Sequence, residues 1–353
     1  MKIVIATDAW HPQVNGVVRT IEATARILAS RGHDVSIISP DQFKTVACPG
    51  YSEIRLAIAP RIRARKRLHA LRPDIVHIAT EGPIGWSTRG WCLSHDVPFT
   101  SAFHTRFPDY AAVRTGLSPD VFWPTIRRFH APSHAVLAST LSLMDELRTR
   151  GFANTKLWSR GIDTEIFQPN LTPLASLSNL PRPILLSVGR VAVEKNLGSF
   201  LDADVSGTKV VVGDGPMLET LRRRFPDAIF TGALMGKDLA SAYAAADVFV
   251  FPSRTDTFGL VMIEALACGV PVAAYPVPGP LDIIGVEGRG SRNELSLPIG
   301  VLDRDLSRAI VRAMLSDKNG AANYGKSFSW ERSADQFVDA LMTAFYNAVK
   351  RAA

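Results

Sequence analysis

Apolar runs and amphipathic segments alternate along most of the 353-residue chain. The runs carry no polar alternation, which predicts strands buried on both faces. The segments between them repeat apolar residues at i, i+3 and i+4, which predicts helices. In the first half, strands are predicted at 2–6, 35–39, 75–78, 99–102 and 135–139, and helices at 17–31, 85–95 and 141–150. This alternation predicts parallel sheets covered by helices on both faces.

The alternation breaks once and then resumes. Residues 168–183 are rich in Pro, Ser and Asn, a composition typical of a linker, and we place a domain boundary there. Further strands are predicted at 184–188, 208–212, 248–251 and 270–274, and helices at 217–225, 237–246 and 259–268. The last stretch is amphipathic, with Phe337, Leu341 and Phe345 on one face. We therefore predict domains at 1–168 and 169–328, with a C-terminal helix at 329–353 that crosses back to the first domain.

The most informative stretch runs from Thr255 to Val272, where a polar loop leads into a short apolar helix. Gly269 is placed to end this helix in the left-handed conformation, and the proline after Val270 prevents its continuation. The first helical amides, near Phe258, Gly259 and Leu260, have no partner within the helix and lie at the positive end of its dipole. A phosphate would satisfy them.

Two carboxylates accompany this helix start. Asp256 lies in the loop beside Thr257, and Glu264 follows eight residues after Asp256, one turn inside the helix. Both could flank a bound anion. An ordinary capped helix with one exposed glutamate explains the same residues equally well.

Other candidate residues follow predicted strands, where parallel sheets bind their ligands. Gly16 precedes a helix, and Gly213 lies in a GDGP turn; both allow close approach to the backbone, or are simple turn glycines. His104 could donate to a sugar hydroxyl, or be structural. Arg190 and Lys195 could grip a diphosphate from two sides, or be solvated surface cations.

The charge balance adds a possible partner surface. The formal net charge is +7, which favours polyanions. One segment without acidic residues is a candidate for binding an anionic membrane, with a solvated helix or a nucleic-acid patch as alternatives. It contains Arg61, Arg63, Arg65, Lys66 and Arg67. A second candidate membrane or acceptor surface contains Phe122, Trp123, Arg127, Arg128 and Phe129.

Several classes are disfavoured. Three cysteines at unrelated spacings indicate neither a disulfide framework nor a zinc site, and the acidic pair Asp303 and Asp305 is a weak metal candidate, so no metal or cofactor is expected. No apolar run is long enough to span a membrane, and the N-terminus is too quickly polar for a signal peptide. We expect a cytoplasmic protein that associates peripherally with the inner face of the cell membrane. The strand-end loops offer no stacking platform for nucleic acid, which is not expected as a partner.

Taken together and in order, these segments resemble the retaining glycosyltransferases of family 4, which have the GT-B fold. The resemblance covers nearly the whole chain. It is carried by the loop ending at Gly16, HTRFPDY at 104–110, SVGRVAVEKN at 187–196, VVGDGP at 211–216 and PSRTDTFGLVMIEALACGVPV at 252–272. It implies an α/β protein of two Rossmann-like domains whose parallel sheets face across a deep cleft.

The resemblance also implies roles for the candidate residues. Arg190 and Lys195 would bind the donor diphosphate, Glu264 the ribose hydroxyls, and Asp256 with the backbone of 257–260 the sugar and the β-phosphate. Gly16 and Gly213 would line the donor site, and His104 would contact the transferred sugar. The family's first glutamate is Asp256 here, one methylene shorter.

The activity implied is transfer of a hexose or hexuronic acid, with retention and without a metal, through attack on the face that the leaving phosphate vacates. A UDP-sugar donor and a lipid acceptor such as diacylglycerol are favoured, because similar enzymes glycosylate membrane lipids. The alternative is mannosyl transfer from GDP-mannose to a saccharide or a polyprenyl-linked acceptor. A nucleotide-sugar epimerase and a non-catalytic binding module are less favoured.

Overall fold

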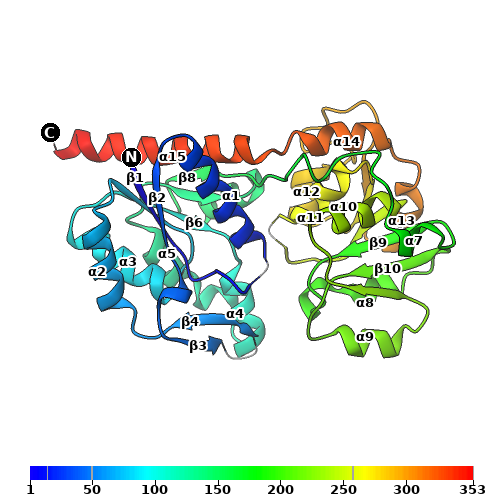
Figure 1. Ribbon diagram of the computed structural model, residues 1–353, viewed down its shortest axis with the longest axis horizontal. Helices are drawn as coiled ribbons and strands as arrows, with labels where there is room; N and C mark the ends of the chain where they lie inside the picture. Colours follow the sequence, from blue (N-terminus) through cyan, green and yellow to red (C-terminus); the bar gives the residue numbers. More distant parts are fainter. Residues whose placement is uncertain (14, 49–50, 257, 353) are drawn as a thin grey trace. The chain divides into compact units, whose positions relative to one another are not determined.

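The computed structural model describes residues 1–13, 15–48, 51–256 and 258–352. Its contacts divide the chain into two compact units (Figure 1): an N-terminal unit of Met1–Arg160 with Trp330–Ala353, and a C-terminal unit of Gly161–Ser329. The first boundary lies before the predicted one at Gln168, because Ile162 and Phe167 are buried in the core of the C-terminal unit. The Pro-rich stretch 168–183 therefore belongs to that unit, since its composition reflects exposure and not a linker.

The N-terminal unit contains a parallel sheet of six described strands in the order β2-β1-β5-β6-β7-β8. These strands are β1 (Lys2–Ala6), β2 (Asp34–Ile38), β5 (Ile75–Ile78), β6 (Phe99–Phe103), β7 (Val136–Ala138) and β8 (Thr155–Leu157). The helices are α1 (Gly16–Ser30), α2 (Arg61–Leu71), α3 (Pro83–Ser94), α4 (Phe107–Thr115), α5 (Trp123–His130), α6 (Leu141–Thr149) and α15 (Trp330–Ala352). Single turns η1 (Pro40–Gln42) and η2 (Pro119–Val121) and an antiparallel hairpin, β3 (Thr45–Cys48) with β4 (Tyr51–Ala57), complete it.

The central strands are apolar because both faces of the sheet are covered. In β1, Ile3 and Ile5 pack into one core cluster, whereas Val4 and Ala6 pack into another on the opposite face. Phe337 of α15 belongs to the first of these clusters, and Figure 1 shows α15, in red, beside α1. The C-terminal helix thus completes the core of the N-terminal unit.

The C-terminal unit repeats the architecture with a second parallel sheet, in the order β11-β10-β9-β12-β13-β14. The strands are β9 (Ile184–Val188), β10 (Thr208–Val212), β11 (Ile229–Gly232), β12 (Val248–Phe251), β13 (Val272–Ala274) and β14 (Gly300–Leu302). The helices are α7 (Ala175–Ser178), α8 (Leu197–Leu201), α9 (Leu218–Arg224), α10 (Gly236–Ala245), α11 (Leu260–Ala267), α12 (Pro278–Ile284), α13 (Leu306–Ala313) and α14 (Lys318–Lys326), with the turn η3 (Val193–Lys195). Two parallel-sheet Rossmann-like units are the architecture predicted from the sequence.

The end of α11 follows the predicted chemistry. Gly269 has a φ of +77°. The amides of Gly269 and Val270 bond back to the carbonyls of Leu266 and Ala265, a pattern that closes a helix and satisfies its last carbonyls. Val270 is therefore part of the helix cap, and the strand predicted to begin there starts at Val272.

Candidate functional site

The loops after β9 and β10 are locked together by their backbones. The amide of Gly189 donates to the carbonyl of Val212, and that of Val191 donates to the carbonyl of Asp214, both at 2.9 Å. Gly213 has a φ of +143°, and a Cβ there would lie 1.8 Å from the carbonyl oxygen of Gly189. Only glycine fits this approach, which fixes the turn that carries Arg190.

The turn η3 is fastened to the loop after β12. The side-chain amide of Asn196 donates to the carbonyl of Pro252 at 3.0 Å, and the hydroxyl of Ser253 donates to the carbonyl of Glu194 at 3.3 Å. These bonds place the ammonium of Lys195 against Asp256, with Nζ 2.6 and 2.8 Å from the two carboxylate oxygens. Both side chains are part-buried, at 27% and 17% exposure. The structure thus brings Lys195 to Asp256.

The start of α11 is a glycine turn. Gly259, the N-cap, has a φ of +91°, and a Cβ there would lie 2.8 Å from the end of Met262 and 2.9 Å from the ring of Phe251. Phe258 is buried and Leu260 is half-buried. No side chain of the described residues caps this helix, so its first amides suit an anion. The predicted contact at Thr257 lies outside the described residues.

Glu264 points into the core of the C-terminal unit. It is fully buried and accepts a hydrogen bond at 3.0 Å from the hydroxyl of Tyr243 on α10, whose oxygen also lies 3.2 Å from the carbonyl oxygen of Val261. The alternative of an exposed glutamate on a capped helix is therefore wrong. Burying a carboxylate costs free energy unless it is hydrogen-bonded, and the hydroxyl of Tyr243 supplies such a bond.

In the N-terminal unit, Gly16 opens α1 immediately after the cap residue Asn15. The side-chain oxygen of Asn15 accepts from the amides of Val17 at 3.0 Å and Val18 at 3.1 Å. Two donors of this helix start are therefore already used. Asn15 does not engage the amide of Gly16.

His104 directly follows β6 and is buried. The guanidinium of Arg160 donates to its Nδ1 at 2.6 Å. Burial lowers the pKa of His104 well below its ordinary value, and the charge of Arg160 lowers it further. His104 is therefore neutral at physiological pH.

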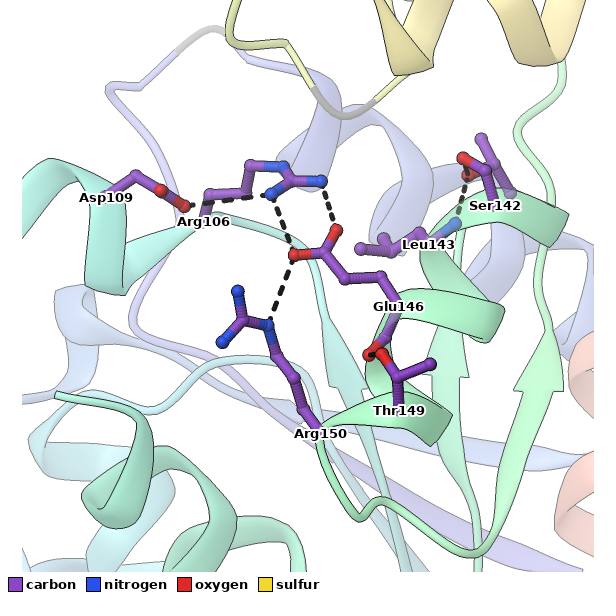
Figure 2. Close-up of polar contacts among 8 residues, drawn as sticks. Arg106, Asp109, Ser142, Leu143, Glu146, Thr149 and Arg150 are labelled. Carbon is purple, nitrogen blue, oxygen red and sulfur yellow. Dashed lines mark hydrogen bonds and ion pairs between the residues drawn. The ribbon is translucent and has the colours of Figure 1, made fainter. Parts of the chain in front are cut away.

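The loop after His104 is anchored to α6 through a charged cluster (Figure 2). Both terminal nitrogens of Arg106 donate to the carboxylate of Glu146, and Arg150 donates to the same carboxylate at 3.4 Å. Asp109 lies 3.8 Å from Arg106 on its other side. This cluster fixes the chain after His104, and β6 fixes the chain before it, so both neighbouring segments position His104.

Asp8 was not among the predicted residues. It follows β1 and accepts from the amides of Ile84 at 2.8 Å and Gly85 at 3.2 Å, at the start of α3, and from the hydroxyl of Thr80. Burial raises its pKa to about 6 against the lowering effect of these bonds. Its place two residues after a predicted strand was the available signal, whereas no strand was predicted before Arg160. Tyr243 lies within a helix and had no such signal.

The two predicted membrane surfaces fare differently. On α2, Ala64 and Leu68 are buried and anchor the helix, whereas the basic residues lie outside. Arg61, Arg63, Lys66 and Arg67 are exposed, and Arg65 is half-buried. Ile62 is 82% exposed beside them. This helix therefore presents both charge and an apolar side chain to solvent.

The second surface was wrong in its aromatic part. Trp123 is 5% exposed, stacks on Phe103, and has the guanidinium of Arg150 4.1 Å from its ring centroid. Phe129 is fully buried. These two rings belong to the core because α5 turns its apolar stripe inward. Of the residues predicted for this surface, Arg127 and Arg128 are exposed and Phe122 is half-buried.

In the part of the chain that the structure describes, no three His, Cys, Asp or Glu side chains gather as a metal would require. No helix of the same residues is both long enough and apolar enough to cross a membrane.

Comparison with known proteins gives the family. The profile of Glycosyltransferase Family 4 matches residues 14–166, and that of Glycosyl transferases group 1 matches residues 182–316. A GDP-mannose-dependent alpha-mannosyltransferase of Mycobacterium tuberculosis is 30% identical over 88% of this chain and 87% of its own. The alpha-monoglucosyldiacylglycerol synthase of Streptococcus pneumoniae is 27% identical over 99% and 86%.

The fold is shared with solved structures. Sucrose-phosphate synthase from Thermosynechococcus elongatus superposes with a TM-score of 0.73 at 23% identity, covering 99% of each chain. The two Rossmann-like units are therefore those of the GT-B fold.

Proposed function

This chain belongs to glycosyltransferase family 4, and we propose that it transfers a hexosyl unit from a nucleotide sugar to a glycerolipid or glycolipid at a membrane surface, with retention. The observation that carries the donor part is the convergence of two strand ends in the C-terminal unit. The Gly189–Arg190 turn, the Lys195–Asp256 pair and the start of α11, which no described side chain caps, follow β9 and β12, which are next to one another in the sheet.

The proposed donor site offsets charge with fixed groups. Arg190 and Lys195 with the first amides of α11 stabilise the nucleoside diphosphate as it leaves, and groups already in place need no reorganisation during the reaction. Glu264 binds the ribose hydroxyls, and Gly213 lines the site. When the diphosphate binds, Lys195 leaves its ion pair with Asp256 and contacts a phosphate oxygen. The carboxylate of Asp256 is then free to bind the sugar hydroxyls.

The proposed reaction proceeds on one face of the sugar. The bond between the anomeric carbon and the donor oxygen breaks, the acceptor oxygen bonds to the same face, and the acceptor proton passes to the leaving phosphate. Gly16 approaches the diphosphate, and His104 contacts the transferred sugar. No metal takes part, so activity should persist in EDTA.

The lipid acceptor is proposed from two observations. The S. pneumoniae relative is named for a glucosylated diacylglycerol. The helix α2 presents four exposed cations and the exposed Ile62. Each cation near an anionic membrane contributes about 1 kcal/mol, and the apolar side chain can enter the interface. We propose that α2, with Arg127 and Arg128, holds the enzyme on the membrane.

Two donors are in competition. The family resemblance of the sequence favoured a UDP-sugar as donor, whereas the name of the mannosyltransferase relative at 30% identity favours GDP-mannose. Mannosyl transfer to a saccharide or a polyprenyl-linked acceptor remains the second candidate, because the name of that relative gives no lipid.

The first experiment is a donor and acceptor screen. The protein is incubated with GDP-mannose, UDP-glucose, UDP-galactose or UDP-glucuronate, each with diacylglycerol or glycosyl-diacylglycerol micelles, and the products are identified by mass spectrometry. We expect a glycosylated lipid, retention of configuration, and loss of the product in Arg190→Ala and Lys195→Ala. Product formed only with soluble saccharides would reject the lipid acceptor, and free altered sugar would indicate an epimerase.

Membrane association is tested separately by liposome flotation. Wild type should float with vesicles containing phosphatidylglycerol at low salt, and Arg63→Glu with Lys66→Glu should remain in the buffer. The matched control is Arg223→Glu with Lys237→Glu, which makes the same charge change at exposed positions of the C-terminal unit. Equal flotation of the two double variants would show that α2 is not the membrane surface.

A further inference from the structure

Arg160 is a buried cation close to the proposed sugar contact. It is 6% exposed, lies at the end of the N-terminal unit and donates to the carbonyl of Trp158 at 3.2 Å. Its guanidinium also lies 5.3 Å from the centroid of the Trp158 ring. Its second directional contact is the 2.6 Å bond to Nδ1 of His104.

Burying the guanidinium of Arg160 costs free energy. Burial lowers the pKa of Arg160 to about 10, and no carboxylate among the described residues opposes that effect. It remains protonated at neutral pH. Among the described residues, this charge contacts a carbonyl, a ring face and an imidazole. Burial with such partners is unfavourable, so a purely structural role would be served better by an apolar side chain of similar size.

The contact determines where the proton of His104 lies. A guanidinium has only N–H donors and no lone pair to offer. The Nδ1 atom of His104 must therefore accept, and in the neutral ring the single proton must lie on Nε2. A second proton on Nδ1 would point at the N–H groups of Arg160, which excludes the imidazolium as well.

We propose that Arg160 is a positioning residue that holds His104 in the Nε2–H tautomer, so that His104 serves the reaction as a fixed hydrogen-bond donor and never as a general base. The mechanistic part of this inference rests on the proposed function; the tautomer itself does not. Nε2–H then donates to a hydroxyl oxygen of the transferred sugar.

The groups around His104 support a constant charge state. Arg160 faces it from the segment after β8, and His77 and His130 are its other titratable neighbours. The pKa of His77 is lowered to about 3, first by burial and then by Arg160, so His77 is neutral across the working range. His130 bonds through Nδ1 to Ser101 and through Nε2 to Glu81.

The direct test is the tautomer, measured without any substrate. Long-range ¹H–¹⁵N spectra of ¹⁵N-histidine-labelled protein report which ring nitrogen carries the proton, and the signals of His104 are assigned by their absence in His104→Gln. We expect Nε2–H and an unprotonated Nδ1, unchanged between pH 8 and pH 5.5. Arg160→Leu should give mixed tautomers or a titrating ring, and Arg160→Lys should restore the wild-type pattern. Nδ1–H in the wild type, or an unchanged pattern in Arg160→Leu, would overturn the inference.

The kinetic test separates positioning from folding. The terminal amide nitrogen of glutamine can take the place of Nε2, and that of asparagine cannot, so His104→Gln should retain about tenfold more kcat than His104→Asn, the value of one good hydrogen bond. If Arg160 acts only through His104, adding Arg160→Leu to His104→Ala should lower kcat no further. Additive losses would contradict the positioning role. A protein without transferase activity would reject the proposed function and leave the spectroscopic test intact.

Discussion

The pair of Lys195 and Asp256 leads to a prediction with opposite signs for its two members. In the structure described here the ammonium contacts both carboxylate oxygens. If Lys195 binds the donor diphosphate, this pair must open first, and its strength is subtracted from the affinity for nucleoside diphosphate. Asp256→Asn should therefore tighten binding of GDP or UDP, whereas Lys195→Met should weaken it.

The magnitude follows from the part-buried position of the pair. Exposed ion pairs contribute about 0–1 kcal/mol, and charge-assisted hydrogen bonds about 1.5–3 kcal/mol. With side chains 17–27% exposed, we take about 1–2 kcal/mol. At 1.36 kcal/mol per factor of ten, Asp256→Asn should bind nucleoside diphosphate about 5–30-fold more tightly. Lys195→Met should lose at least about tenfold, because it removes the cation itself.

Isothermal titration calorimetry with GDP and UDP measures both effects at fixed salt. Asp227→Asn is the matched control, since it removes one exposed carboxylate from the same unit. Transfer is assayed in parallel, because Asp256→Asn should lose activity while it gains diphosphate affinity. Asp256→Glu restores the length found in the family and should retain activity. Weaker binding by Asp256→Asn, or unchanged binding by Lys195→Met, would refute an exchange of partners at Lys195.

Three further predictions concern stability and donor affinity. The pKa of Asp8 is raised to about 6 in the folded protein, so as the pH falls from 7 to 4.5 the folded state takes up a proton that the unfolded chain largely does not. The unfolding free energy of wild type, relative to that of Asp8→Asn, should therefore rise by about 2 kcal/mol over this range. A difference that does not change with pH in urea titrations would contradict this. Gly213→Ala should destabilise the C-terminal unit by about 2–4 kcal/mol and abolish nucleoside diphosphate binding. The control Gly198→Ala, within α8 and with nothing within 4 Å of its added Cβ, should melt at or slightly above the wild-type temperature in calorimetry. Tyr243→Phe removes a hydrogen bond from buried Glu264 and should weaken GDP or UDP binding by about 1 kcal/mol, so unchanged titration isotherms would show that Tyr243 does not orient this carboxylate.

Much of the fold was predictable because it is encoded locally. Strands buried on both faces need apolar residues throughout, and such runs identified β1, β5, β6, β9, β10 and β12. The hairpin of β3 and β4 was not predicted, because its strands mix polar and apolar residues and depend on pairing with each other.

Surface assignments were less predictable than strands. Arg127 and Arg128 share an amphipathic helix with Trp123, so proximity in the sequence suggested one mixed surface. The structure buries the ring of Trp123 and leaves Arg127 and Arg128 exposed. Arg128, five residues after Trp123, lies on a different side of α5, whereas Arg127, only four residues after it, lies near the same side, so spacing did not predict its exposure. The direction of a side chain depends on what its helix packs against, which a short window of sequence does not contain.

The sequence by itself determined the alternation that gives two parallel sheets, the glycines that turn at Gly213 and Gly269, and the order of motifs that indicates the family. Only the tertiary structure decided that Lys195 meets Asp256, that Tyr243 holds Glu264, and that Arg160 donates to His104. The reason is physical. A glycine turn or an apolar strand depends on neighbours along the chain, whereas these pairs join residues from different strand ends and helices, and their distances exist only once the sheets have formed.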